Sequence, residues 1–117
     1  DKQGVEESGN VVVKHIIGTR GRAMQTGDGF SSPYDVSVDE SHLYVSDHNN
    51  RRVKIYDKES FELLRSIQFT YNPVAVCVDD QHLYVSNKSR HVVDVFSKED
   101  GSLVQSIGGG GGQRRIQ

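Results

Sequence analysis

The chain has 117 residues, of which 34% are hydrophobic, and a formal net charge of −2 at pH 7. One folded domain is typical of this length, and nearly balanced charge excludes a strong overall attraction to nucleic acid or membranes. The single cysteine excludes an intrachain disulfide, and no apolar run approaches the roughly 20 residues of a membrane span. We therefore expect a chain without a membrane segment, in a reducing compartment such as the cytoplasm.

Residues 1–10 are polar, and we expect them to form a disordered or flexible N-terminus. The next stretch, VVVKHIIG at residues 11–18, is rich in β-branched side chains, which predicts a strand. A glycine-rich connector then continues to residue 32. We expect 11–32 to hold one strand, near residues 11–17, followed by a loop into the first complete unit.

Residues 33–72 contain four predicted strands, at about 34–39, 42–46, 52–57 and 62–67. Apolar side chains alternate with others in VSV, LYV and VKIY, which is the period of a half-buried strand. Turn-forming segments such as DESH and DHNNR separate the strands. This order predicts an antiparallel meander.

The second unit, residues 73–107, repeats the first with a shift of 40 positions and no gap. The segment HLYVS, for example, occupies residues 42–46 and returns at 82–86. Equal loop lengths imply that the two units have nearly the same backbone. Residues 108–117 begin with glycines and are expected to form a flexible tail.

Four short antiparallel strands that recur every 40 residues describe a blade of a β-propeller. We predict an all-β fold of two four-stranded antiparallel propeller blades plus one extra outer strand. A propeller closes with about 4–8 blades, whereas two blades leave their outer faces uncovered. We expect further blades to complete the ring, from a longer parent chain or by homo-oligomerisation.

The first unit resembles the NHL-repeat family of β-propellers. GDGFSSPYDVSVD and LYVSDHNNRRVKIYD carry the resemblance, with a proline before the inner strand, an aspartate after it and an N-x-R-V entry to the third strand. The resemblance covers about residues 16–108 and implies a structural role for Arg52. The second unit departs from the pattern at three positions: Asn87 stands for Asp47, Arg90 for Asn50 and Val92 for Arg52.

A meander sorts its loops onto two ends of the blade. Loops between second and third strands share one end with the connectors between blades, and the other turns share the opposite end. The first end carries mainly basic residues and the second mainly acidic ones. We predict that a partner contacts the basic end through Arg20, Arg22, Tyr34, His48, Arg51, Lys88, Arg90 and His91.

Few residues suggest reactive chemistry. No His, Cys or carboxylate positions have metal-ligand spacing such as H-x-x-x-H or C-x-x-C, so we expect no metal and no other cofactor. His42 and His82 recur at the repeat period, as do Asp39 and Asp79, which favours structural roles over catalysis. Cys77 lies in a predicted strand, and we expect a buried, inert thiol.

Three classes of function remain open. A non-enzymatic scaffold that binds a protein needs no reactive group, and we favour it. The NHL resemblance implies a second class, an RNA-binding face as in ubiquitin-ligase-type proteins with tripartite motifs, where Tyr34 would stack on a base. It also implies a third, a metal-dependent enzyme similar to peptide-amidating lyases. The third is disfavoured because that chemistry needs disulfides and the chain has one cysteine.

Overall fold

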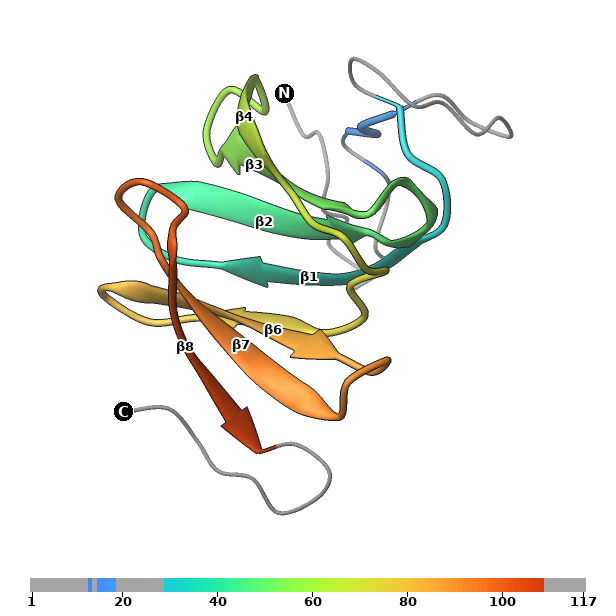
Figure 1. Cartoon of the computed structure of the whole chain (residues 1–117). Helices are drawn as coiled ribbons and strands as arrows, with labels where there is room; N and C mark the ends of the chain where they lie inside the picture. Colours follow the sequence, from blue (N-terminus) through green and yellow to red (C-terminus); the bar gives the residue numbers. More distant parts are fainter. Residues whose placement is uncertain (1–12, 14, 19–28, 109–117) are drawn as a thin grey trace, which may run out of the picture.

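The computed structural model describes residues 13, 15–18 and 29–108 (Figure 1). These residues form two four-stranded antiparallel sheets in which sequential strands are neighbours. The first blade contains β1 (Pro33–Val38), β2 (His42–Asp47), β3 (Arg52–Asp57) and β4 (Leu63–Gln68). The second blade contains β5 (Val76–Val78), β6 (His82–Asn87), β7 (Val92–Ser97) and β8 (Leu103–Gly108). The predicted all-β fold is confirmed, and within the described residues the helical structure is one short 3₁₀ turn, η1 (His48–Asn50).

The extra outer strand predicted near residues 11–17 is not formed by the described part of that stretch. Val13 and residues 15–17 belong to neither sheet. A strand needs a hydrogen-bonded neighbour, and the outer strand of a preceding blade would pair with that blade's own third strand. The segment instead contacts the first blade, where the His15 ring stacks on Phe61 with centroids 4.6 Å apart. The predicted flexible N-terminus, 1–10, lies outside the described residues. The predicted tail, 108–117, does too except for Gly108, which is not a flexible residue but the last residue of β8.

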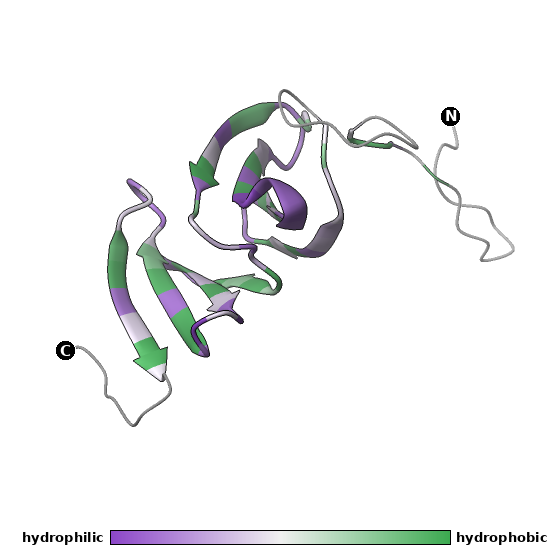
Figure 2. Cartoon of the chain, turned by 45° about the vertical axis from the view of Figure 1, so that its right-hand side comes forward, coloured by the Kyte–Doolittle hydropathy of each residue, from purple (hydrophilic) through white to green (hydrophobic). Residues whose placement is uncertain are grey.

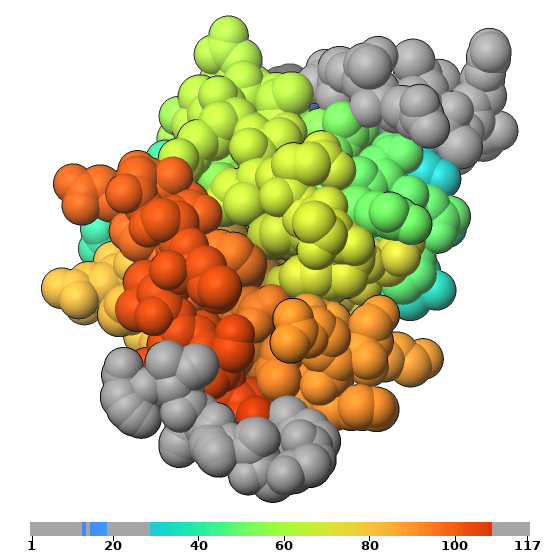
Figure 3. All heavy atoms as spheres, viewed as in Figure 1, coloured from blue at the N-terminus to red at the C-terminus, as the bar shows by residue number. Residues whose placement is uncertain are grey.

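The two blades pack face to face, because alternate side chains of each strand point into the space between them. The strands show this alternation as successive hydrophobic and hydrophilic bands (Figure 2). The first and second blades lie directly against each other, with the connector between them also in contact (Figure 3). The buried core consists of Tyr44, Val53, Ile55, Phe69, Val76, Leu83, Val85 and Phe96.

The other face of the first blade is covered in part by the segment before β1. Lys54 is fully buried there, its Nζ donates a hydrogen bond of 2.9 Å to Gly29 O, and it lies 4.8 Å from the centroid of the Phe30 ring. A buried ammonium is tolerated because the carbonyl and the aromatic face replace part of its hydration. The residues just before β1 therefore belong to the folded blade.

The recurring aspartates shape the turns between the first two strands of each blade. Asp39 Oδ1 accepts hydrogen bonds from the amides of Ser41 (2.9 Å) and His42 (2.7 Å). Asp79 Oδ1 accepts the equivalent bonds from Gln81 (3.0 Å) and His82 (2.8 Å). These carboxylates replace backbone partners that a tight turn leaves open, and the structural interpretation of the repeated aspartates is confirmed.

Candidate partner-binding face

One end of the two blades, here called the loop face, consists of residues 31–34, 48–51, 69–74 and 87–91. The β2–β3 loop and the connector between blades meet there, as a meander requires. Asn72 Nδ2 donates to His48 O at 2.8 Å, and the Phe69 amide donates to Arg51 O at 2.7 Å. The loop sorting derived from the sequence therefore matches the structure.

Tyr34 and His48 form an aromatic pair on this face. Their rings are nearly parallel, 7° apart, with centroids 4.0 Å from each other. His48 Nδ1 lies 3.1 Å from Pro73 O, which fixes the imidazole against the connector. Tyr34 is 57% exposed, so the pair presents an aromatic surface to solvent. The sequence placed both residues on this face, but their direct contact emerges only in three dimensions.

The predicted basic residues of the loop face lie on two equivalent loops. Arg51 is exposed in the β2–β3 loop, and Lys88, Arg90 and His91 are exposed in the β6–β7 loop. Arg51 and His91 occupy the same repeat position, and both adopt the left-handed conformation, with φ of 58° and 60°. None of the ion pairs found within the described part of the chain involves Arg51, Lys88 or Arg90. Arg20 and Arg22 lie outside the described residues.

The carboxylate of Asp47, at the edge of this face in the first blade, is buried and paired. Asp47 has no exposed surface and accepts hydrogen bonds from Arg52 Nε at 2.7 Å, Ser31 N at 2.6 Å and Asn50 Nδ2 at 3.0 Å. Arg52 also donates to Gly29 O at 3.1 Å. The structural role implied for Arg52 is confirmed, and the loop-face residues that the structure describes expose no carboxylate.

The second blade replaces this ion pair by a different buried network. Asp94 takes the repeat position of Lys54, and its carboxylate accepts hydrogen bonds from Tyr71 OH (2.7 Å), Asn87 Nδ2 (3.3 Å) and Ser106 Oγ (2.6 Å). Burial and the bond to Asp94 raise the pKa of Tyr71 well above its usual value. Asn87, one of the departures of the second unit from the repeat pattern, is therefore part of this network.

A groove of about 350 Å³, which sequence reasoning missed, lies beside the cations of the β6–β7 loop. Its walls include the apolar side chains of Val74, Val93 and Ile107, together with Lys88 and His91. The groove combines an apolar floor with a basic rim. Such a site can hold an apolar side chain flanked by negative charge.

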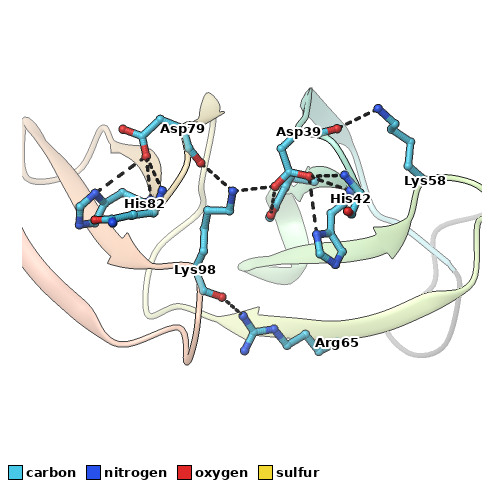
Figure 4. Close-up of polar contacts among 10 residues, drawn as sticks. Asp39, His42, Lys58, Arg65, Asp79, His82 and Lys98 are labelled. Atoms are coloured by element: carbon cyan, nitrogen blue, oxygen red, sulfur yellow. Dashed lines mark hydrogen bonds and ion pairs between the residues drawn. The ribbon is translucent and has the colours of Figure 1, made fainter.

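The opposite end, here called the turn face, carries the β1–β2, β3–β4, β5–β6 and β7–β8 turns. There Lys98 of the second blade contacts Asp39 of the first, with Nζ 2.7 Å from Oδ2 (Figure 4). Arg65 donates a hydrogen bond to Lys98 O. Burial alone would raise the pKa of Asp39, but hydrogen bonds from Lys98, Tyr44 and two backbone amides outweigh it and hold the pKa well below its usual value. This contact stabilises the blade pair.

One sequence-based expectation about the site is wrong. Cys77 is exposed, not buried. Its side chain points to the face of the second blade that no other described sheet covers, whereas the neighbouring Val76 faces the first blade and is buried. Alternation along a strand does not say which of the two faces is covered.

Two further features are absent from the residues that the structure describes. No helix there is long and apolar enough to cross a membrane. Nor do three or more His, Cys, Asp or Glu side chains in those ranges come close enough together to hold a metal ion.

The two packed meanders define a pair of propeller-type blades. No protein-family model matches the chain, and no curated protein matches it either. Among solved structures, the chain is similar to Kuenenia stuttgartiensis hydrazine synthase, a protein that contains a β-propeller, with a TM-score of 0.58 and 22% sequence identity. The match covers 75% of this chain but spans only 26% of that one. At this identity the likeness shows the fold alone.

Proposed function

We propose that the chain is a non-enzymatic scaffold of NHL-type propeller blades that binds an acidic protein segment on its loop face. One observation carries the proposal: exposed Arg51, Lys88 and Arg90 share this face with an apolar groove, and the described loop-face residues include no carboxylate. The exposed free thiol of Cys77 fits a reducing, cytoplasmic setting.

The face offers two kinds of contact that an extended acidic segment can use. Exposed cations attract the segment and speed its association, although each rim charge adds little affinity by itself. The aromatic surface of Tyr34 and the groove beside Val74 and Ile107 provide the apolar contacts that dominate affinity. A partner with acidic residues around one large apolar side chain fits this arrangement.

Single-stranded RNA is the second candidate, and the Tyr34–His48 pair is the observation that favours it. An exposed ring held flat by a second ring is a platform on which a base can stack, and such stacking contributes about 1–3 kcal/mol per base. Phosphates would then contact the neighbouring cations. The two candidates share the face but differ in which group Tyr34 recognises.

The test compares two labelled probes on the same variants: an acidic peptide with one central leucine, and a uridine-rich single-stranded RNA. The variant Arg51→Gln/Arg90→Gln removes two charges from the loop face. The control Ser41→Glu/Gln81→Glu changes net charge by the same amount at two equivalent positions on the turn face. We expect the loop-face variant to weaken peptide binding about tenfold and the control to change it less than about twofold.

The outcomes separate the candidates. Peptide binding that responds only to the loop-face variant supports the scaffold. RNA binding that falls with Tyr34→Ala, and whose salt slope falls by about one unit per lost phosphate contact in Arg51→Gln/Arg90→Gln, supports the RNA-binding face instead. Equal effects of the two double variants on both probes would show that only net charge matters, and the proposal would be wrong.

A further inference from the structure

We propose that the two ends of the blade pair are complementary, so that the first blade of a second copy docks on the free face of the second blade and Lys58 of one copy pairs with Asp79 of the other. The partner is a second copy of this chain, joined head to tail. This inference concerns the outer sheet faces and does not rest on the proposed function. The incoming copy and the partner of the loop face would share the groove beside Val74 and Ile107, so they compete for it.

The interface inside the chain shows what such docking looks like. One face of the first blade, including Val53, packs against one face of the second, including Val76. The repeat places the same kinds of side chain on the two free faces. Val36 corresponds to Val76 but is 59% exposed where Val76 is 5% exposed, and Val93 corresponds to Val53 but is 38% exposed where Val53 is 0% exposed. The outer faces of the two described blades therefore carry exposed apolar positions from both sides of an interface that the chain already forms once. On the first blade, Val45 and Tyr56 of the same face are already buried, so the open part of that face is the part along β1.

Charges at the turn face give the contact a direction. Lys98 Nζ donates to Asp79 O of its own blade at 2.6 Å and pairs with Asp39 of the neighbouring blade. Lys58 makes the equivalent bond to Asp39 O at 2.8 Å. None of the ion pairs within the described residues joins Lys58 to a carboxylate. The Asp79 side chain is 53% exposed, against 18% for Asp39. Lys58 and Asp79 are thus the open positions of the inter-blade ion pair.

The groove on the loop face has a counterpart between the two blades, where the connector residue Pro73 fills the equivalent space. In the first blade, His48 contacts Pro73 O of the connector. Lys88 has the same repeat position as His48, and it lines the groove with Val74 and Ile107. The segment around Pro33 of an incoming copy would take the place in this groove that Pro73 takes beside His48.

Two features make this contact weaker than the internal one. Asp35 Oδ2 accepts a hydrogen bond of 3.0 Å from Val76 N between the blades, but Ala75 stands at the equivalent position of the second blade. The His15–Phe61 stack also lies where β8 of another copy would pack, since Gly101, the equivalent of Phe61, lies against β4 at Ile67. We therefore expect reversible association that displaces the segment at His15.

Charge reversal tests the direction of docking. Asp79→Lys places a lysine opposite Lys58, and Lys58→Asp places an aspartate opposite Asp79, so each variant alone repels copies of itself. In an equal mixture, Lys58 of the first variant can pair with Asp79 of the second, which is the original ion pair. The two substituted positions can also face each other, which gives an ion pair with its charges exchanged. Sedimentation velocity should show each variant associating about tenfold more weakly than the unaltered chain, and the mixture recovering. Asp80→Lys, on the same turn as Asp79, is the control and should associate normally.

Thiol reactivity provides an independent readout on the unaltered chain. Cys77 is the one cysteine, and it lies on the free face of β5. Because β1 packs against β5 inside the chain, an incoming β1 would cover it. Its reaction rate with a disulfide reagent should fall several-fold as protein concentration rises. Phe61→Gly, which removes the His15 stack, should strengthen association.

Three results would overturn the proposal: a monomer at every concentration with constant Cys77 reactivity, single reversals that associate normally, or a mixture that fails to recover. The last would indicate a symmetric contact through one face rather than head-to-tail docking. If the reversed variants do not fold, judged by circular dichroism, the Cys77 measurement on the unaltered chain decides.

Discussion

Lys98 joins the two blades through Asp39: its Nζ lies 2.7 Å from Asp39 Oδ2, and each of the two side chains is only 18% exposed. The same Nζ donates to Asp79 O within its own blade. Figure 4 shows Lys98 reaching across from the second blade to the turn of the first. Because one ammonium satisfies acceptors on both blades, it fixes how they sit relative to each other.

Replacing Lys98 should therefore cost more than replacing its repeat counterpart. We expect Lys98→Met to lower the free energy of unfolding by about 1.5–3 kcal/mol, the range for hydrogen bonds to charged groups. Lys58→Met, which removes a bond within one blade only, should cost less than half as much. Urea unfolding in dilute solution measures both. Equal losses would mean that the contact between blades adds no stability.

Asp39 should make stability depend on pH in the acid range. Its folded pKa lies below the usual value of 3.8, so the unfolded chain takes up a proton more readily. The stabilisation is then complete above about pH 5 and is lost as pH falls through 3.8 toward the folded pKa. Asp39→Asn should be less stable at neutral pH. Its midpoint of urea unfolding, plotted against pH, should also fall less steeply below pH 5, in the acid limb of the curve.

The control for that experiment is Asp80→Asn, which removes an exposed charge from the second blade's turn. It should leave the acid limb nearly unchanged. Asp79 will contribute a residual slope, since the hydrogen bond from Tyr84 OH lowers the pKa of its carboxyl to about 2. An Asp39→Asn variant with the full original slope would contradict the assignment.

The buried Asp47–Arg52 pair should show strong coupling. Arg52→Val alone leaves a buried carboxylate without its cation, which costs about 3–5 kcal/mol. Asp47→Asn/Arg52→Val introduces the residues that the second blade has at these positions, Asn87 and Val92, and should recover most of the loss. A double-mutant cycle by thermal or urea unfolding measures the coupling. Additive effects of the two changes would show that the pair does not act as a unit.

The turn between the last two strands of each blade provides a backbone test. Gly101 has φ of +78°, and a Cβ there would lie 3.4 Å from Ile67 Cγ1. We expect Gly101→Ala to cost about 1–2 kcal/mol, the strain of a left-handed residue with a side chain. Phe61 has φ of 64° at the equivalent position, so Phe61→Gly should be more stable than Phe61→Ala by about the same amount. Both substitutions remove the ring, which isolates the backbone effect.

Local patterns in the sequence were sufficient to predict the strands, the turns and the end of the blade on which each loop lies. Apolar alternation and turn-forming residues act over a few positions, and the gapless repeat fixes loop lengths. The turn roles of Asp39 and Asp79 followed from recurrence alone. The described residues near 11–17 form no strand, because a strand also needs a neighbour to pair with.

The two meanders, and the separation of basic loops from acidic turns, depend on period and loop length, so the order of amino acids is enough to predict them. Which face of each sheet is covered depends instead on the packed molecule, where Val76 is buried and Cys77 is exposed on the same strand. The contact between Lys98 and Asp39 is of the same kind. A pair joined across two blades depends on how the sheets stack, and stacking is set by the packing of many side chains at once rather than by any one segment.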